Sequence, residues 1–233
     1  MANTLFLALQ GPLQAWGERG RWAVRDSALL PTKSGIVGLL GCALGWADDA
    51  RLLALSQAIE IGVRADGPGV LLTDYHTVVG GVLSASGKVK RNATTKELET
   101  VVSWRDYIAD AAFLAAIRGP EEIISRCAAA VCRPVWPPYL GRKSCPPARP
   151  LYEGVGRYDS VEEALSQWPR LAEAGPALEG GVTVEVPVEY GRGLRRSDEL
   201  LSRARRMYGV RSVQRLLVRP PEPPEEDPCT SPD

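Results

Sequence analysis

The hydrophobic pattern of the first 132 residues predicts strands and helices in the order of a βαββαβ unit. An apolar run over residues 4–9, closed by Gly11 and Pro12, predicts a buried strand. Pro31 and Thr32 then open a helix whose apolar positions continue to about Gly45. The same criteria predict a short helix over 50–58, strands over 60–65 and 70–79, an apolar run over 101–117 and a helix from 119–121 to about Cys132.

This order indicates an α+β protein with a ferredoxin-like (RRM-like) antiparallel sheet and its helices on one face. Many RNA-binding proteins share that arrangement, although the aromatic signature of a standard RNA recognition motif is absent from the sequence. Residues 80–100 are rich in Gly, Ser, Lys and Thr and lack apolar periodicity, so they predict a protruding excursion.

We therefore expect a body over 1–150 and a small C-terminal extension over 151–219 that completes the fold. In the extension, Ser160 and Glu163 predict a capped helix to Trp168, and further strands are expected over 182–190 and 211–218. Residues 220–233 contain six prolines and many acids, which is typical of a disordered tail.

Composition argues against several classes of protein. With 233 residues and 45% hydrophobic content, the chain can bury a proper core. No apolar run reaches the roughly 18 residues of a membrane span, and residues 1–10 are unlike a secretory signal, so we expect a cytoplasmic protein. Five cysteines without regular spacing predict reduced thiols. A single histidine and no C-x-x-C pair argue against zinc, and we expect no cofactor.

Charge is unevenly distributed along a chain whose formal net charge is zero. Residues 88–105, 133–157 and 191–219 are basic, whereas residues 158–189 contain seven carboxylates and only one arginine. This polarity favours a polyanion such as nucleic acid on one surface and a protein neighbour on another. The alternative is that each block is an ordinary solvated surface.

Residues 137–147, PPYLGRKSCPP, are the strongest candidate for an anion-binding loop. Prolines fix the backbone at both ends, and Gly141 permits a sharp turn or a close approach. Between them, Arg142 offers a planar fork for phosphate oxygens, Lys143 a point charge and Ser144 a hydroxyl donor. The alternative is a proline-rich surface loop with solvated cations.

The start of the helix at Pro31 offers a second anion site, because Lys33 and Ser34 lie where backbone N–H groups attract phosphate. The missing first glycine argues against a P-loop. Gly35, Gly38 and Gly41 recur within this helix and require close packing. We favour packing against the sheet over contact with a bound polymer.

Five separated motifs together resemble a known family. They are GPLQAWG at 11–17, PTKSGIVGLLG at 31–41, DYHT at 74–77, WRDY at 104–107 and PPYLGRKSCP at 137–146. In this order they resemble the CasD family, the Cas-five-type subunits of subtype I-E CRISPR Cascade complexes. The resemblance covers residues 3–155; beyond these it rests on the arginine-rich approach to the last strand, and 158–200 are unassigned.

The resemblance implies a non-catalytic subunit that binds the 5′ handle of CRISPR RNA and caps one end of the backbone subunit filament. It implies contacts with the backbone and large subunits, and with target DNA only indirectly. Residues 78–104 would form the family's thumb over the guide. The implied RNA-binding candidates in this sequence are Lys33, Ser34, Lys88, Lys90, Arg91, Lys96, Trp104, Arg105, Tyr139, Gly141, Arg142, Lys143, Ser144, Arg206 and Arg211.

Two alternatives accompany this interpretation. Trp104 fits a core aromatic as well as an RNA contact. Some relatives in another subtype cleave precursor guide RNA, so a metal-independent endoribonuclease is the rival function, although His76 alone supplies neither an acid–base pair nor an obvious partner.

Overall fold

The computed structural model describes residues 2–18, 23–84, 86–176 and 179–223. Its helices are α1 (Lys33–Leu44), α2 (Asp49–Ala58), α3 (Glu121–Cys132) and α4 (Val161–Gln167). Its strands are β1 (Thr4–Gln14), β2 (Val24–Arg25), β3 (Glu60–Gly67), β4 (Val70–Val79), β5 (Thr100–Arg118), β6 (Tyr152–Gly156), β7 (Val182–Val188), β8 (Leu194–Ser202) and β9 (Met207–Val218).

The described strands form one nine-stranded sheet with the order β6-β1-β5-β3-β7-β9-β8. Strands β2 and β4 lie off this path and both pair with β5. All pairs between these strands are antiparallel except β2–β5, which is parallel. The chain therefore has the mixed helix-and-strand composition and the largely antiparallel sheet that its sequence predicts.

The two faces of the sheet bury separate cores, because side chains alternate between faces along each strand. On one face Leu5, Leu7 and Leu9 of β1 pack with α1, α2 and α3. On the other, Phe6 and Ala8 pack with α4. The expectation that the helices cover one face is wrong for α4. A continuous apolar run such as residues 4–9 needs cover on both sides of its strand.

A fully buried ion pair fastens α4 and the segment after it to the sheet. Arg64 on β3 pairs with Asp66 at 2.6 Å, and both side chains are inaccessible to solvent. The Arg64 guanidinium also donates to the carbonyl groups of Leu165, Trp168 and Pro169. Because every one of these partners lies beyond residue 160, this pair holds the C-terminal part of the chain against the back of the sheet.

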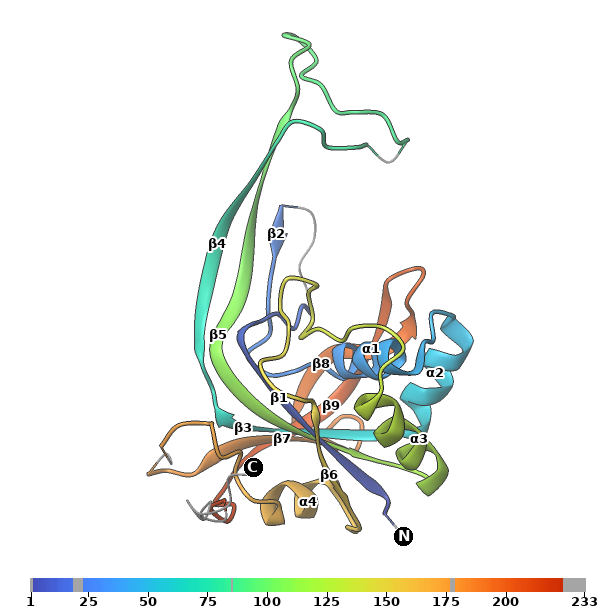
Figure 1. Ribbon diagram of the computed structural model, residues 1–233, viewed down its shortest axis with the longest axis vertical. Coiled ribbons are helices and arrows are strands. Elements are labelled where there is room, and N and C mark those ends of the chain that lie inside the picture. Colours follow the sequence, from blue (N-terminus) through green and yellow to red (C-terminus); the bar gives the residue numbers. More distant parts are fainter. Residues whose placement is uncertain (1, 19–22, 85, 177–178, 224–233) are drawn as a thin grey trace, which may run out of the picture.

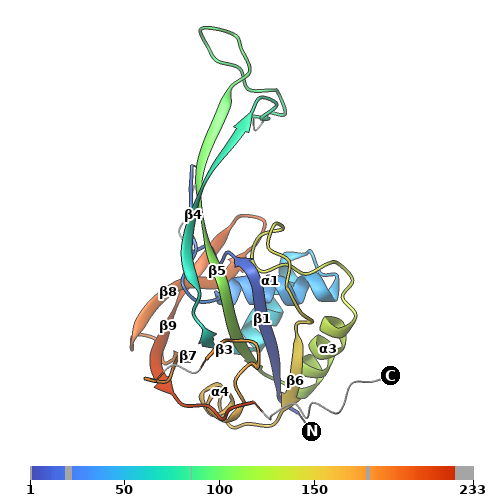
Figure 2. The ribbon, with the colours of Figure 1, turned by 60° about the vertical axis from the view of Figure 1, so that its left-hand side comes forward.

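A long hairpin leaves the body of the protein (Figures 1 and 2). The C-terminal half of β5 lies between β1 and β3 in the sheet, and its N-terminal half continues outward paired with β4 from Val70↔Ala109 to Val79↔Thr100. Residues 80–84 and 86–99, within the segment predicted to protrude, lie at the far end. One strand thus serves both the core and the projection.

The remaining sequence expectations concern the cysteines, the membrane and the tail. Cys42, Cys127, Cys132 and Cys145 are free thiols. In the described ranges, no helix is long and apolar enough to cross a membrane. Most of the predicted tail over 220–233 lies outside the described residues; within 220–223, the Pro221 carbonyl accepts a hydrogen bond from the Arg170 backbone.

Candidate nucleic-acid interface

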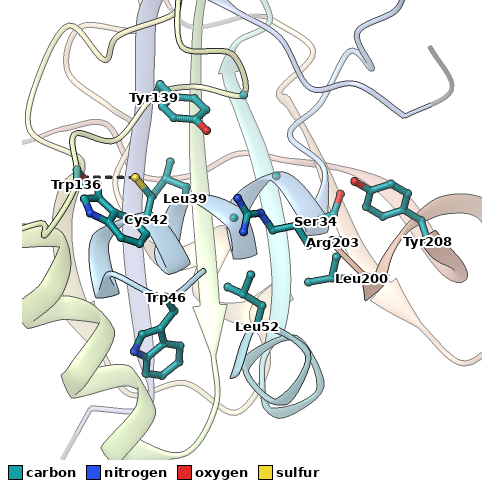
Figure 3. Close-up of a pocket in the computed structure, with 13 residues that line it drawn as sticks. Ser34, Leu39, Cys42, Trp46, Leu52, Trp136, Tyr139, Leu200, Arg203 and Tyr208 are labelled. Atoms are coloured by element: carbon teal, nitrogen blue, oxygen red, sulfur yellow. Dashed lines mark hydrogen bonds between the residues drawn. The ribbon is translucent and has the colours of Figure 1, made fainter. Parts of the chain in front are cut away.

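A groove of about 270 Å³ crosses the outer surface of α1 (Figure 3). Its floor is α1, where Ser34, Gly38 and Leu39 line it. One side is the segment after α3, which supplies Trp136, Tyr139 and Gly141, and the other is the β8–β9 hairpin, which supplies Leu200, Arg203 and Tyr208. Trp46, after the end of α1, also lines the groove, so four aromatic side chains and an arginine surround a glycine-containing helix face.

The groove floor depends on how α1 is capped and packed. Thr32 is the N-cap and accepts a hydrogen bond from the Gly35 backbone, and Gly45 ends the helix in the left-handed conformation. A Cβ on Gly35 would lie 2.8 Å from the Trp16 ring, and one on Gly41 would lie 2.4 Å from Leu52. The glycines of α1 were expected to pack against the sheet. Gly35 and Gly41 instead pack against the side chains of Trp16 and Leu52. A Cβ on Gly38 would meet nothing within 4 Å, so this glycine opens the floor.

The loop at 137–147 is pinned to the body rather than lying loosely on the surface. Leu140 and Cys145 are fully buried, and the Leu140 carbonyl accepts a hydrogen bond from the Ala15 backbone. Gly141 has φ +87°, and a Cβ there would lie 1.7 Å from the Ala15 carbonyl oxygen. Only glycine fits this turn. The loop is therefore fixed to the body at Leu140, Gly141 and Cys145.

The side chains at the centre of that loop differ in their availability. Arg142 turns inward and donates to the carbonyl groups of Arg25, Asp26 and Asp106. Its guanidinium is therefore occupied by backbone carbonyls of the protein, and its expected contact with phosphate stays a prediction. Lys143 is exposed, and Ser144 is exposed with its hydroxyl 3.9 Å from the Cys145 thiol. Lys143 is the basic side chain of this loop that faces solvent.

Lys33 and Arg211 lie in a charge cluster that links β7, β8 and β9 to the start of α1. The Lys33 ammonium pairs with Glu199 at 2.8 Å, and the Lys33 backbone N–H donates to Asp198. Arg211 pairs with Asp198 at 2.7 Å. Carboxylates therefore pair with both cations within the protein, and the RNA contacts of Lys33 and Arg211 stay predictions.

The Asp198 carboxylate is the centre of this cluster and is only 1% exposed. Burial acts to raise its pKa, but the hydrogen bond and charge of Arg211 and the Lys33 backbone N–H together hold the pKa below its usual value. The charged form is therefore the stable one in the folded protein.

The predicted cations of the hairpin lie at its far end, away from the body that contains the groove. Lys88 and Lys90 are exposed. Arg91 donates to the Lys96 carbonyl at 2.9 Å, and the Lys96 ammonium donates to the Ala93 carbonyl at 2.7 Å. All four side chains lie on an exposed surface, where a polyanion has access to them.

Trp104 and Arg105 lie on the stem of the hairpin. Trp104 is 45% exposed and contacts Tyr75 edge-on, with ring centres 5.6 Å apart. The interpretation of Trp104 as a core aromatic is therefore wrong. Arg105 is half-buried and donates to the Ser103 hydroxyl at 3.2 Å.

The structure therefore brings three of the predicted residues, Ser34, Tyr139 and Gly141, to one groove, and Arg206 lies exposed on the β8–β9 turn beside it. Sequence reasoning missed Trp136, Arg203 and Tyr208. Arg203 belongs to the arginine-rich block already recognised, and Trp136 directly precedes the proline-rich loop. No sequence signal assigned Tyr208 to the groove, because its position depends on the β8–β9 pairing.

Comparison with known proteins shows which family the chain belongs to. The family model described as CRISPR-associated protein (Cas_Cas5) matches residues 4–214. The chain belongs to this Cas5 family. A relative from Escherichia coli (strain K12), the CRISPR system Cascade subunit CasD, is 37% identical over 179 residues, which cover 71% of this Cas5 chain and 76% of the relative. The predicted resemblance to CasD is confirmed.

Two solved structures share the fold of this Cas5 chain. A crystal structure of a Cas protein matches with a TM-score of 0.71 and 31% identity, covering 95% of this chain and 99% of the other. A chain of a CRISPR RNA-guided surveillance complex matches with a TM-score of 0.73 and 30% identity, covering 94% and 91%.

Proposed function

We propose that this Cas5 chain is a non-catalytic, RNA-binding subunit of a Cascade-type CRISPR surveillance complex and that the groove across α1 holds the 5′ handle of CRISPR RNA. The relative's name makes that protein a Cascade subunit, and the matched complex is RNA-guided. The observation that carries the proposal is the groove itself, with aromatic side chains on both sides of an open helix face.

The groove has the chemistry that single-stranded RNA requires. Trp136, Tyr139 and Tyr208 offer ring faces on which bases stack whatever their sequence. Arg203 lines the groove, and Lys143, Arg205 and Arg206 are exposed on its two sides, where phosphates would lie. The Ser34 hydroxyl and the bare Gly38 backbone let a strand approach α1 closely.

The hairpin supports a second part of the proposal, contact with neighbouring subunits. Lys88, Lys90, Arg91 and Lys96 sit far from the body, so they can reach RNA beyond the groove while the stem lies beside the neighbouring backbone subunit. Exposed Tyr75 and Trp104 give that stem an apolar surface suited to a protein neighbour or an unstacked base. Another surface would contact the large subunit, and DNA would be contacted only indirectly.

We also infer that the body is ferredoxin-like. The antiparallel order β6-β1-β5-β3 corresponds to the order 4-1-3-2 of a βαββαβ unit, with α1 after its first strand and α3 after its third. The division into a body over 1–150 with a thumb over 78–104 and an extension over 151–219 is part of this proposal.

The proposal also states that the chain does not cleave RNA. Cleavage of RNA needs a general base and a general acid beside the attacked hydroxyl. The chain's one histidine, His76, lies on β4 with Nδ1 3.5 Å from Asp74 and does not line the groove. Incubation of a labelled repeat RNA with the purified protein and EDTA tests this. We expect intact RNA, whereas two defined fragments would support the endoribonuclease.

Binding is tested by fluorescence anisotropy with the full chain and a labelled RNA of the handle sequence, titrated over a range of salt concentrations. Log affinity should fall linearly with log salt, with a slope of about −0.7 for each phosphate contact. Replacing Lys143, Arg205 and Arg206 with alanine should make that slope shallower by about 2. Arg192→Ala is the matched control, since Arg192 is 79% exposed but pairs with Glu189 and does not line the groove. An affinity independent of salt would exclude the proposal.

A further inference from the structure

Arg142 joins three segments that are far apart in the sequence. One nitrogen of its guanidinium donates to the Asp106 carbonyl at 3.0 Å, and the other donates to the carbonyls of Arg25 at 2.8 Å and Asp26 at 3.2 Å. The guanidinium carbon also lies 4.7 Å from the centre of the Tyr107 ring. Its contacts are thus backbone carbonyls and one aromatic face, all within the protein.

These contacts lie where the hairpin leaves the body. Asp106 and Tyr107 are on β5 and pair with Thr73 and Leu72 of β4, at the base of the hairpin. Arg25 ends β2, which runs beside β5 at Arg105. Figures 1 and 2 both show the segment between α3 and β6 approaching β5 in this region. Arg142 therefore connects the loop over residues 137–147 to the base of the hairpin through hydrogen bonds.

The same loop forms one side of the groove. Tyr139 and Gly141 line the groove, and Arg142 follows them directly in the sequence. Gly141 is held against Ala15, so the backbone has little freedom to absorb a movement between the groove and the stem. A change at either end of this short segment is therefore passed to the other.

We infer that Arg142 is a positioning residue that couples the groove to the hairpin, so that occupation of the groove by RNA stabilises the hairpin stem. The part of this inference that concerns RNA rests on the proposed function. A planar fork is required, because only a guanidinium lies flat on a ring while donating to carbonyls on two sides. An ammonium keeps the charge and can donate to carbonyls, but it is not planar and cannot lie flat on the ring at the same time.

Hydrogen exchange, measured with and without handle RNA, tests the coupling in the full chain. The wild-type stem amides around Trp104, whose N–H donates to the Ala23 carbonyl, should exchange more slowly when RNA is bound. In Arg142→Lys and Arg142→Ala the stem should exchange at least about tenfold faster without RNA and lose the slowing on binding. Lys143→Ala, one residue away, should leave stem exchange as in the wild type.

The salt dependence of RNA affinity separates positioning from direct phosphate contact. Both Arg142 variants should weaken binding about fivefold to tenfold with the wild-type slope, whereas Lys143→Ala should make the slope shallower by about 0.7. A wild-type response from Arg142→Lys, or a shallower slope for Arg142→Ala with unchanged stem exchange, would overturn the inference. If Arg142→Ala does not fold, Arg142→Lys carries the comparison because it keeps the charge.

Failure of the proposed function gives a different result. A wild-type chain that binds no handle RNA would remove that proposal, while faster stem exchange in Arg142→Lys would still establish the link between loop and hairpin. Conversely, normal RNA binding with equal stem exchange in the wild type and Arg142→Lys would remove the link alone.

Discussion

The Lys33 ammonium lies 2.8 Å from the Glu199 carboxylate, and the backbone N–H of the same lysine donates to Asp198. Strand β8 therefore supplies both a counter-ion for Lys33 and an anionic partner for the positive end of α1. The helix N-terminus that the sequence offers as a phosphate site is already filled by a carboxylate. The groove begins at the next residue, Ser34.

Lys33→Met should lower the free energy of unfolding by about 1–2 kcal/mol, because Glu199 would lose a charged hydrogen-bond partner. RNA affinity should keep its slope against salt, since no phosphate contact is removed. Urea unfolding and anisotropy measure the two effects. Lys143→Ala is the control with the opposite pattern, unchanged stability and a shallower slope. A stable Lys33→Met variant with a shallower slope would show that Lys33 binds RNA after all.

Gly141→Ala should unfold the loop around residues 137–147 and abolish handle binding. The added methyl group would lie 1.7 Å from the Ala15 carbonyl oxygen, so the backbone must move. Thermal unfolding and anisotropy report the two consequences. Gly191→Ala separates strain from collision, because Gly191 has φ +94° but open space around it. This control should cost about 1–2 kcal/mol and leave binding intact. Equal effects of the two substitutions would contradict the account.

The sequence predicted the parts of the fold that depend on local pattern. The helix after Thr32, its end at Gly45 and the capped helix at Ser160 all occur where capping chemistry indicates them. The placement of α4 on the second face was not predicted, because it depends on Phe6 and Ala8 receiving cover from residues more than 150 positions away. Such pairing has no local signature.

In the candidate site, too, residues with a local sequence signature were predicted, and those that depend on distant parts of the chain were not. Gly141 was identified because a left-handed turn demands glycine, and Tyr139 followed from its position in the loop. For Arg142, Lys33 and Arg211 the sequence did not predict the partners that the fold supplies. A cluster of cations in a sequence indicates positive charge, whereas their availability depends on which carboxylates and carbonyls the fold places beside them. Tyr208 reaches the groove only through the pairing of β8 with β9.

Stability should fall on acidification through the protonation of Asp198. Its folded pKa lies below its ordinary value, so its contribution is complete above the unfolded pKa of about 3.9 and is lost as pH falls through the folded pKa. Urea unfolding between pH 7 and pH 3 should give a constant free energy down to about pH 5 and a decline below it.

Asp198→Asn tests the assignment of that decline. The variant should be less stable than the wild type at pH 7, and the difference should shrink at pH 3, where the wild-type carboxylate is also losing its charge. Asp159→Asn, at an exposed carboxylate, is the control and should follow the wild-type curve. A difference between Asp198→Asn and the wild type that stays constant across the whole pH range would show that the Asp198 charge is not responsible.

Tyr208→Ala and Tyr139→Ala should each weaken handle binding by about 1–3 kcal/mol, the contribution of one base stacked on an aromatic ring. The slope against salt should stay that of the wild type, because neither side chain carries charge, and Tyr208→Phe should bind normally because it keeps the ring. Anisotropy titrations at several salt concentrations measure both quantities. Tyr190→Ala is the matched control, since Tyr190 is 74% exposed and does not line the groove. Stacking on both sides of α1 requires that the two groove variants weaken binding while the control does not. Equal affinities for all three alanine variants would mean that the strand lies elsewhere, and the exposed cations of the hairpin would then be the surface to test.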